Sequence, residues 1–417
     1  MGGQGWALGV FVLVYAIILA GENSPRKLDR PAAGLIGAVL MVLTGVLTRK
    51  EAVAAIDFGT LALLFGMMVV IHYASASGLL ERLAVRLVAL SHNPRQLLFA
   101  VCASAGVLSA LFVNDTVCLL MTPMVLAIVA KKRLPAEPYL IGLATSSNVG
   151  SVMTLTGNPQ NMLIGQSSGW TWSAFAVRMA PIGILCLLAN GLIVDWIYRK
   201  QLRGAPWQQA DGIAPSGRLD RRVAIKTLCV LSGLVVALLL GAPMDMAALA
   251  AAVVILVWAN RESAETFAAI DWPLLLFFAG LFVVVHGVTK SESFLIGRYV
   301  PVVTRNGGSL GELTGFSLAS LLGSNLFSNV PFVMLIRPWM SDAPHAPLLW
   351  LALASSSTFA GNLTILGSVA NLIVAQQARR EHPLSFWAFL RVGIITTLVT
   401  TAISVLVLFA YHSLSIV

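Results

Sequence analysis

The chain is a series of apolar segments, most of them about as long as a membrane-crossing helix. A helix needs roughly 20 apolar residues to cross ~30 Å of hydrocarbon. The candidate spans are residues 6–21, 32–48, 57–75, 139–165, 174–198, 223–241, 245–259, 270–288, 347–377 and 388–412. The composition agrees, because 58% of the residues are hydrophobic and only 11% are charged, unlike a soluble domain. We therefore expect an all-α integral membrane protein, and we exclude soluble enzymes and nucleic-acid binders.

Two further apolar stretches, residues 96–131 and 309–341, are too long for one span and are interrupted by polar residues. The first is broken at Asn114, Asp115 and Thr116, and the second near Ser328 and Asn329. Polar, broken backbone at membrane depth requires protein or a water-filled cavity around it. We expect each stretch to form a re-entrant helical hairpin, and two short full spans are the alternative.

The second half of the chain repeats the first. Residues 54–57 (Ala-Ala-Ile-Asp) recur as residues 268–271, an offset of 214. Matches at offsets of 210 to 215 continue for more than a hundred residues and pair Asn114 with Asn329, Ser147 with Ser357, and Asn161 with Asn371. Each half therefore holds five spans and one hairpin, with boundaries at 1–198, 199–221 (a basic linker) and 222–417.

Five crossings per half is an odd number, so the second half is inverted relative to the first. Inverted repeats are typical of secondary transporters, whose binding site lies where the repeats meet. Of the 27 Lys and Arg residues, 18 fall on the side of the linker and seven on the other. The positive-inside rule makes the linker side cytoplasmic. We expect a plasma-membrane (inner-membrane) protein with both termini outside.

Two spans contain clusters of small and polar residues that predict unwound helix. Proline disfavours helix before it, and glycine permits an unwound turn. Unwinding frees carbonyl groups for a cation and helix N-termini for oxygen atoms of a solute. Helix packing through small residues is the alternative. The candidate binding residues, including those at the hairpin tips, are Asn114, Thr116, Ser147, Asn148, Asn158, Ser328, Asn329, Ser357, Thr358 and Asn362.

Asp115 is the candidate coupling residue. A carboxylate deep in a membrane segment is costly and by default marks a functional site, and its counterpart in the second half is Val330. We expect it to carry a proton or to help hold a sodium ion. The alternative is a cap for the hairpin helix. His72 and His286 also recur as a pair, which duplication alone explains.

At these motifs the chain resembles the ion transporter superfamily, which includes arsenite permeases of the ArsB type, Na+/H+ antiporters and divalent anion/sodium symporters. Residues 157–161 and 367–371 look like the discontinuous helices of that superfamily. The resemblance covers nearly the whole chain. It implies an elevator-like movement of a hairpin-containing domain against a scaffold, commonly in a homodimer.

The resemblance leaves the substrate open. Dicarboxylate symporters of the superfamily carry Ser-Asn-Thr at both hairpin tips, whereas the tips here are residues 113–115 (Val-Asn-Asp) and 328–330 (Ser-Asn-Val). The candidate residues include no Arg or Lys, the usual partners of carboxylate or sulfate. Neutral amide and hydroxyl groups beside one acid favour a small inorganic solute such as arsenite or antimonite, exported against protons. Cation-coupled transport of a dicarboxylate or sulfate, and Na+/H+ antiport, are the alternatives.

Other classes of protein fit less well. No HExxH motif is present, and the GxSxG match at residues 165–169 lies at the end of a span rather than at a strand-to-helix turn. A passive channel would not require an acid in only one of its two halves. We expect neither catalytic residues nor a metal site, and no cofactor.

Overall fold

The computed structural model describes residues 2–20, 28–79, 81–82, 85–86, 91–205, 207, 219–291, 308–340 and 343–417. Over these ranges the chain is helical and contains no strand, which confirms the expected all-α class. Seven helices there are long and apolar enough to cross a membrane, and four shorter apolar helices accompany them.

The first half contains the helices α1 (Gly2–Ala20), α2 (Arg30–Leu43), α3 (Arg49–Ala54), α4 (Phe58–Ala76), α6 (Pro94–Leu111), α7 (Asn114–Lys132), α8 (Glu137–Ser151), α9 (Pro159–Ser168) and α10 (Trp172–Gly204). The second half contains α11 (Arg221–Leu239), α12 (Met244–Ala259), α13 (Ser263–Ala268), α14 (Trp272–Lys290), α16 (Leu310–Phe327), α17 (Asn329–Met340), α18 (Ala346–Ala360), η2 (Ile365–Gly367), α19 (Val369–Ala378) and α20 (Phe386–Ser413).

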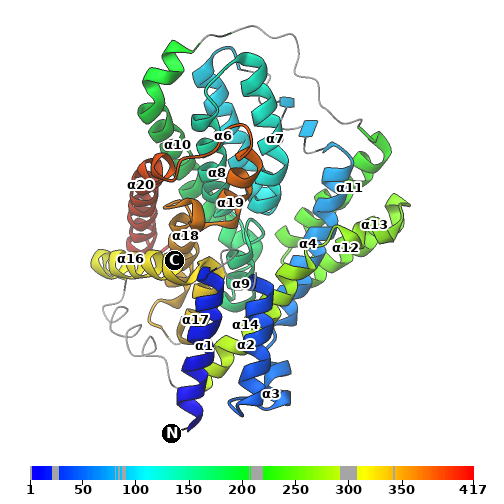
Figure 1. Cartoon of the computed structure of the whole chain (residues 1–417), viewed down its shortest axis with the longest axis vertical. Coiled ribbons are helices and arrows are strands. Elements are labelled where there is room, and N and C mark those ends of the chain that lie inside the picture. Colours follow the sequence, from blue (N-terminus) through cyan, green and yellow to red (C-terminus); the bar gives the residue numbers. More distant parts are fainter. Residues whose placement is uncertain are drawn as a thin grey trace.

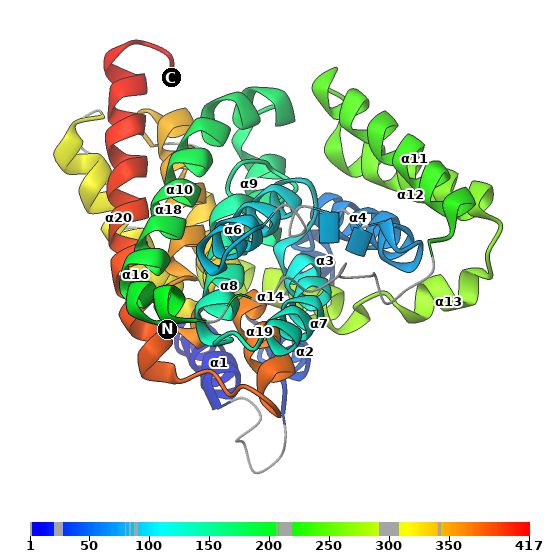
Figure 2. The ribbon, with the colours of Figure 1, turned by 90° about the horizontal axis from the view of Figure 1, so that it is seen from above.

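Helix contacts divide the described chain into two groups. A flank group contains α1 to α4 and α11 to α14, and a central group contains α6 to α10 and α16 to α20. Within the flank group, α2 packs on α14 and α4 packs on α12, so each half supplies one partner to each pair. In both views α11 and α12 lie beside α4 on one side of the molecule, with α16 and α20 on the opposite side (Figures 1 and 2).

The α2–α14 pair depends on glycine. A Cβ atom added to Gly34 would lie 2.9 Å from the carbonyl oxygen of Phe277, and one added to Gly280 would meet the backbone of Gly34. Small residues allow helix backbones to approach this closely in membrane proteins. The N-terminal ends of α2 and α14 are thereby held together, which matters for the site described below.

The polar stretches interrupt the helices where the sequence predicts. α6 and α7 are separated by Phe112 and Val113, and α16 and α17 by Ser328. Ser328 has φ of +69° and ψ of 156°, a backbone region that strains a residue with a side chain. α8 and α9 are separated by residues 152–158, and α18 and α19 by residues 361–368 with their short 3₁₀ turn.

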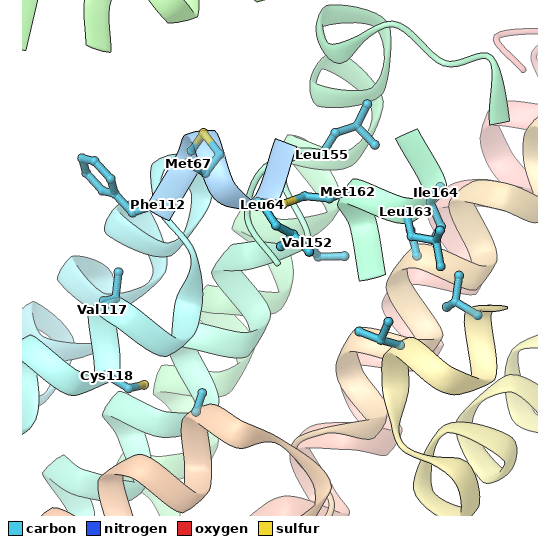
Figure 3. Packing of buried hydrophobic residues seen from close by; sticks show 14 of the residues in the cluster. Leu64, Met67, Phe112, Val117, Cys118, Val152, Leu155, Met162, Leu163 and Ile164 are labelled. Atoms are coloured by element: carbon cyan, nitrogen blue, oxygen red, sulfur yellow. The ribbon is translucent and has the colours of Figure 1, made fainter. Parts of the chain in front are cut away.

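Apolar side chains pack around these interruptions. Leu64 and Met67 of α4 lie near Phe112 at the α6–α7 break and Met162 of α9 (Figure 3), and each of the four is at least 96% buried. An unwound segment exposes backbone polar groups, which in a membrane must be shielded from lipid. The flank helix α4 therefore covers one side of the breaks.

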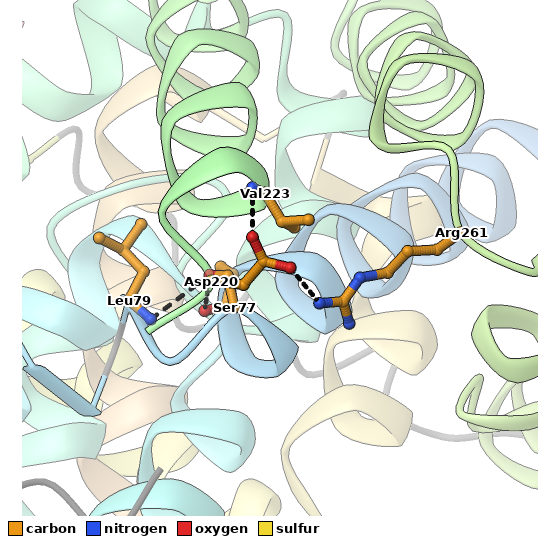
Figure 4. Close-up of polar contacts among 6 residues, drawn as sticks. Ser77, Leu79, Asp220, Val223 and Arg261 are labelled. Carbon is orange, nitrogen blue, oxygen red and sulfur yellow. Dashed lines mark hydrogen bonds and ion pairs between the residues drawn. The ribbon is translucent and has the colours of Figure 1, made fainter. Parts of the chain in front are cut away.

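Ion pairs anchor the ends of several helices. Asp220 caps α11 by accepting a hydrogen bond from the Val223 N–H at 3.1 Å, and its other oxygen accepts one from Arg261 at 2.8 Å (Figure 4). The Arg261 guanidinium holds the pKa of Asp220 below its usual value. Arg337 of α17 pairs with Asp57 at the start of α4 at 2.7 Å, which joins the central group to the flank group.

Candidate functional site

A cavity of about 300 Å³ lies where the interrupted helices meet. The starts of α7 and α17 contribute Asn114, Asp115, Ser328 and Asn329. The second segments of the broken helices, α9 and α19, contribute their N-terminal residues. The remaining lining comes from the N-terminal parts of α2 and α14. The lining residues outside α7 and the Ser328–Asn329 pair are Asp29, Arg30, Pro31, Pro159, Gln160, Asp271, Pro273, Leu274, Phe277, Phe278, Val330, Pro331, Gly367, Ser368 and Val369.

Asp115 lies in the first turn of α7, with its carboxylate close to the backbone N–H of Ala370. Ala370 belongs to the first turn of α19, so the acid lies at the positive end of a helix other than its own. The position opposite Asp115 in the repeat is Val330, which lines the same cavity. No side chain caps the N-terminus of α7, so the structure does not favour the alternative that Asp115 is a helix cap, and Asp115 lines the cavity.

A hydrogen-bonded network of amides lies behind the cavity. Asn148 of α8 accepts from Asn114 at 2.9 Å and from Ser368 at 3.0 Å, and it donates to Asn362 at 2.9 Å and to Asn371 at 3.0 Å. Asn148 is 2% exposed. One side chain thus joins the start of α7 to the broken helix of the second half.

The two broken helices are held open in the same way. The Asn161 amide donates to the carbonyl groups of Ser151 and Thr154, ten and seven residues earlier. The Asn371 amide donates to the carbonyls of residues 361 and 364, again ten and seven residues earlier. A buried asparagine that bonds to the backbone on the far side of a break replaces the missing helical hydrogen bonds.

Several polar atoms at the site have no protein partner. The side-chain oxygens of Asn114 and Asn329, which occupy equivalent positions in the two halves, accept no hydrogen bond, and the Asn362 amide nitrogen donates none. Buried polar groups are nearly always satisfied. Both asparagines line the cavity, so a hydrogen-bond donor bound there is a candidate partner for their side-chain oxygens.

The predicted site residues divide into three sets. Asn114, Asp115, Ser328 and Asn329 line the cavity. Asn148, Asn158, Thr358 and Asn362 are buried behind it, where Asn158 donates to Thr358 at 3.3 Å. The remaining residues are directed elsewhere: Ser147 accepts from the Cys118 thiol, Ser357 donates to the Leu353 carbonyl, and Thr116 is half-buried outside the lining.

The inference that the site contains no basic residue is wrong, because Arg30 lines the cavity. Two acids that were not among the predicted site residues, Asp29 and Asp271, line it as well. They come from the flank group, whose α2–α14 contact is not visible in local sequence. Asp271 caps α14 through the Leu274 N–H at 3.0 Å, as expected for an acid at the start of a span, and it also faces the cavity.

The histidine pair lies outside this site. His286 is exposed and His72 is half-buried, with its ring edge-on to Tyr73 at 5.6 Å between centroids. Neither lines the cavity. No group of three potential metal ligands occurs among the described residues.

Several known proteins with similar sequences are named as transporters. Residues 13–356 match the family model described as "Citrate transporter". A silicon efflux transporter of Oryza sativa is 33% identical, over 96% of this chain and 94% of the relative. A putative arsB transporter of Dictyostelium discoideum is 24% identical, over 95% of this chain and 90% of the relative.

The fold also matches a solved transporter. The YdaH transporter of Alcanivorax borkumensis superposes with a TM-score of 0.59 over 100% of this chain and 99% of that chain, at 16% identity. The helical architecture, the cavity between broken helices and the match over most of the sequence agree with one another. The chain belongs to the citrate transporter family, within the ion transporter superfamily.

Proposed function

We propose that the protein is a proton-coupled exporter of a small, neutral polyhydroxy acid, with arsenite and antimonite as the principal candidates. The cavity is the solute site, and Asp115 is the residue at which the solute and the coupling proton exclude each other. The observation that carries this proposal is the lining of the cavity, where Asp115 in the first turn of α7 lies among neutral amide and hydroxyl groups and acids outnumber the one base.

The two halves form an inverted repeat of five spans and one hairpin each, with boundaries at 1–198, 199–221 and 222–417. Three observations support this arrangement. The reciprocal α2–α14 and α4–α12 pairs exchange partners between halves. The Asn161 and Asn371 amides bond to the backbone at equal spacings. The α7–α19 and α17–α9 contacts are likewise reciprocal.

The charge of the cavity disfavours citrate. Among the described residues, three acids, Asp29, Asp115 and Asp271, line it against one base, Arg30, so with all four ionised these residues carry a net charge of −2 (three negative and one positive). A multivalent anion would enter against this charge, and like charges in a partly buried site repel strongly. A neutral solute carries no such cost.

A polyhydroxy acid also satisfies the atoms that the protein leaves unpaired. Its hydroxyl groups donate hydrogen bonds to the side-chain oxygens of Asn114 and Asn329 and to the Asp115 carboxylate. Its oxygen atoms accept from Ser328 and the N-terminus of α9. Hydrogen bonds to an ionised acceptor are the stronger ones, so the solute binds best when Asp115 is deprotonated. The relatives named for silicon efflux and arsB fit this class, since silicic and arsenious acids are both neutral hydroxides at neutral pH.

Export follows an elevator-like cycle in which the central group moves against the flank group. The orientation that the Lys and Arg distribution predicts puts the N-terminal ends of α2 and α14, and hence the mouth of the cavity, toward the cytoplasm. Among the described helices, contact between the groups is made chiefly by the pairs α4–α9, α14–α17 and α10–α11. The Arg337–Asp57 ion pair crosses this boundary and must break when the central group moves.

A solute panel in proteoliposomes tests the proposal. Arsenite, antimonite, silicic acid, succinate, citrate, sulfate and sodium are each offered with and without an imposed pH gradient, while a trapped dye records internal pH. We expect arsenite or antimonite to move in exchange for protons and citrate to move little. Movement of citrate or sulfate without movement of the neutral acids would refute the proposal.

A small anion is the second candidate. The N-termini of α9 and α19 both face the cavity, and such termini attract anions. Arg30 adds a positive charge beside them. In the same panel, saturable sulfate or succinate transport that requires sodium would favour this candidate, and sodium–proton exchange without any solute would favour Na+/H+ antiport.

A further inference from the structure

Arg30 is a charged residue of the flank group that faces a charged residue of the central group. It is the first residue of α2, behind the Asp29 cap, whose carboxylate accepts from the Ala32 N–H at 3.0 Å. Arg30 and Asp115 line the same cavity and attract each other electrostatically. If the central group moves against the flank group, these two charges must separate.

The surroundings of Asp115 otherwise contain few charges. Asp271 at the start of α14 and Asp29 at the start of α2 face the cavity from the flank group. From the central group, α9, α17 and α19 contribute only neutral residues to the lining, among them Gln160, Asn329 and Ser368. Among the residues that the structure describes, Arg30 is therefore the only cationic side chain that lines the cavity with Asp115.

We propose that Arg30 is a positioning residue that holds the empty, deprotonated central group at the cytoplasmic end of its movement. This inference rests on the proposed proton-coupled export. It identifies what prevents the empty, deprotonated central group from moving without a solute or a proton. An ionised Asp115 that leaves Arg30 loses a favourable charge interaction in a region of low dielectric. Two occupants remove that cost, namely a proton on the carboxylate or a solute whose hydroxyl groups hydrogen-bond to it.

The exchange of proton for solute follows from this rule. The central group moves inward with Asp115 protonated. At the cytoplasmic end the proton leaves to water, and the carboxylate interacts with Arg30. A neutral solute then donates its hydroxyl groups to the carboxylate in place of the guanidinium, and the loaded group moves outward. The empty, ionised state does not move, so each outward passage of solute is matched by an inward passage of a proton.

Arg30→Gln tests this inference in proteoliposomes loaded with arsenite, with a trapped pH dye to count the protons moved per arsenite. Removing the charge lets the empty, ionised group return. Proton-independent arsenite efflux should rise by about tenfold, within the range usual for coupling between sites, and the proton-to-arsenite ratio should fall as pH rises. Arg30→Lys should keep the wild-type ratio. Arg221→Gln, at an exposed position at the start of α11, is the control for the loss of one positive charge.

The double variant Arg30→Gln/Asp115→Asn separates this role from a purely structural one. If Arg30 acts through the charge of Asp115, Arg30→Gln adds no further leak in the Asp115→Asn background. A wild-type ratio in Arg30→Gln, an additive leak in the double variant, or loss of arsenite binding by Arg30→Gln would overturn the inference. If the wild-type protein itself exchanges no protons for arsenite, the proposed function fails instead, so the two failures are distinguishable.

Discussion

Replacing Asn148 with alanine removes the side chain that connects the two broken helices. Four side-chain hydrogen bonds are lost, to Asn114, Asn362, Asn371 and Ser368. Side-chain hydrogen bonds between membrane helices average ~0.6 kcal/mol each, which gives about 2.4 kcal/mol for the four. The buried donors left unpaired add ~1 kcal/mol or more. We expect the free energy of unfolding to fall by about 2–4 kcal/mol.

Unfolding of the purified protein by SDS titration, followed by circular dichroism, measures this loss. Ser167→Ala is the matched control, because the Ser167 hydroxyl bonds only to the Leu163 carbonyl of its own helix and its removal should cost less than ~0.5 kcal/mol. Asn148 lies behind the cavity, so the arsenite KM of the folded variant should change little. Unchanged stability combined with lost solute affinity would refute this reasoning and would indicate that Asn148 contacts the solute directly.

Two smaller perturbations test neighbouring features. Cys118→Ser should leave arsenite transport largely unchanged, because the Cys118 thiol donates to Ser147 at 3.1 Å and does not line the cavity; loss of transport in a folded variant would make the thiol a ligand. The Lys290 side chain and the backbone of Thr48 lower the pKa of Glu51 from 4.5 to about 2. This stabilisation is present above pH 4.5 and is lost as pH falls toward 2, so Tm should decline over that window in the wild type and less in Glu51→Gln. An equal decline in both would contradict the assignment.

Local sequence predicts the places where helices break. Glycine, proline and paired asparagines at residues 157–161, and glycine, serine and asparagine at residues 367–371, disfavour continuous helix, and the structure interrupts both spans next to them. The same holds at Asn114 and Ser328, where short polar runs cut long apolar stretches. The four lining residues next to these breaks, Asn114, Asp115, Ser328 and Asn329, could therefore be predicted from the sequence.

The charge of the cavity could not be predicted in this way. Arg30 and Asp271 are about 240 residues apart in sequence, and they meet at the cavity because α2 packs on α14 through Gly34 and Gly280. Each looks like an ordinary charge at the end of a span. The sequence also could not show that Asn148 is buried behind the cavity, since its hydrogen-bond partners come from both halves of the chain. Local sequence located the helix breaks, whereas the side-chain partners from distant segments required coordinates.

The proton dependence of uphill arsenite movement, compared in wild type and Asp115→Asn, tests the central proposal most directly. In proteoliposomes with an imposed pH gradient, we predict that the wild type concentrates arsenite on the acidic side while the dye reports matching proton movement. Asp115→Asn should lose this accumulation but remain folded by circular dichroism. The account would be contradicted if Asp115→Asn accumulated arsenite at the wild-type level. It would also be contradicted if arsenite movement by the wild type did not depend on the pH gradient.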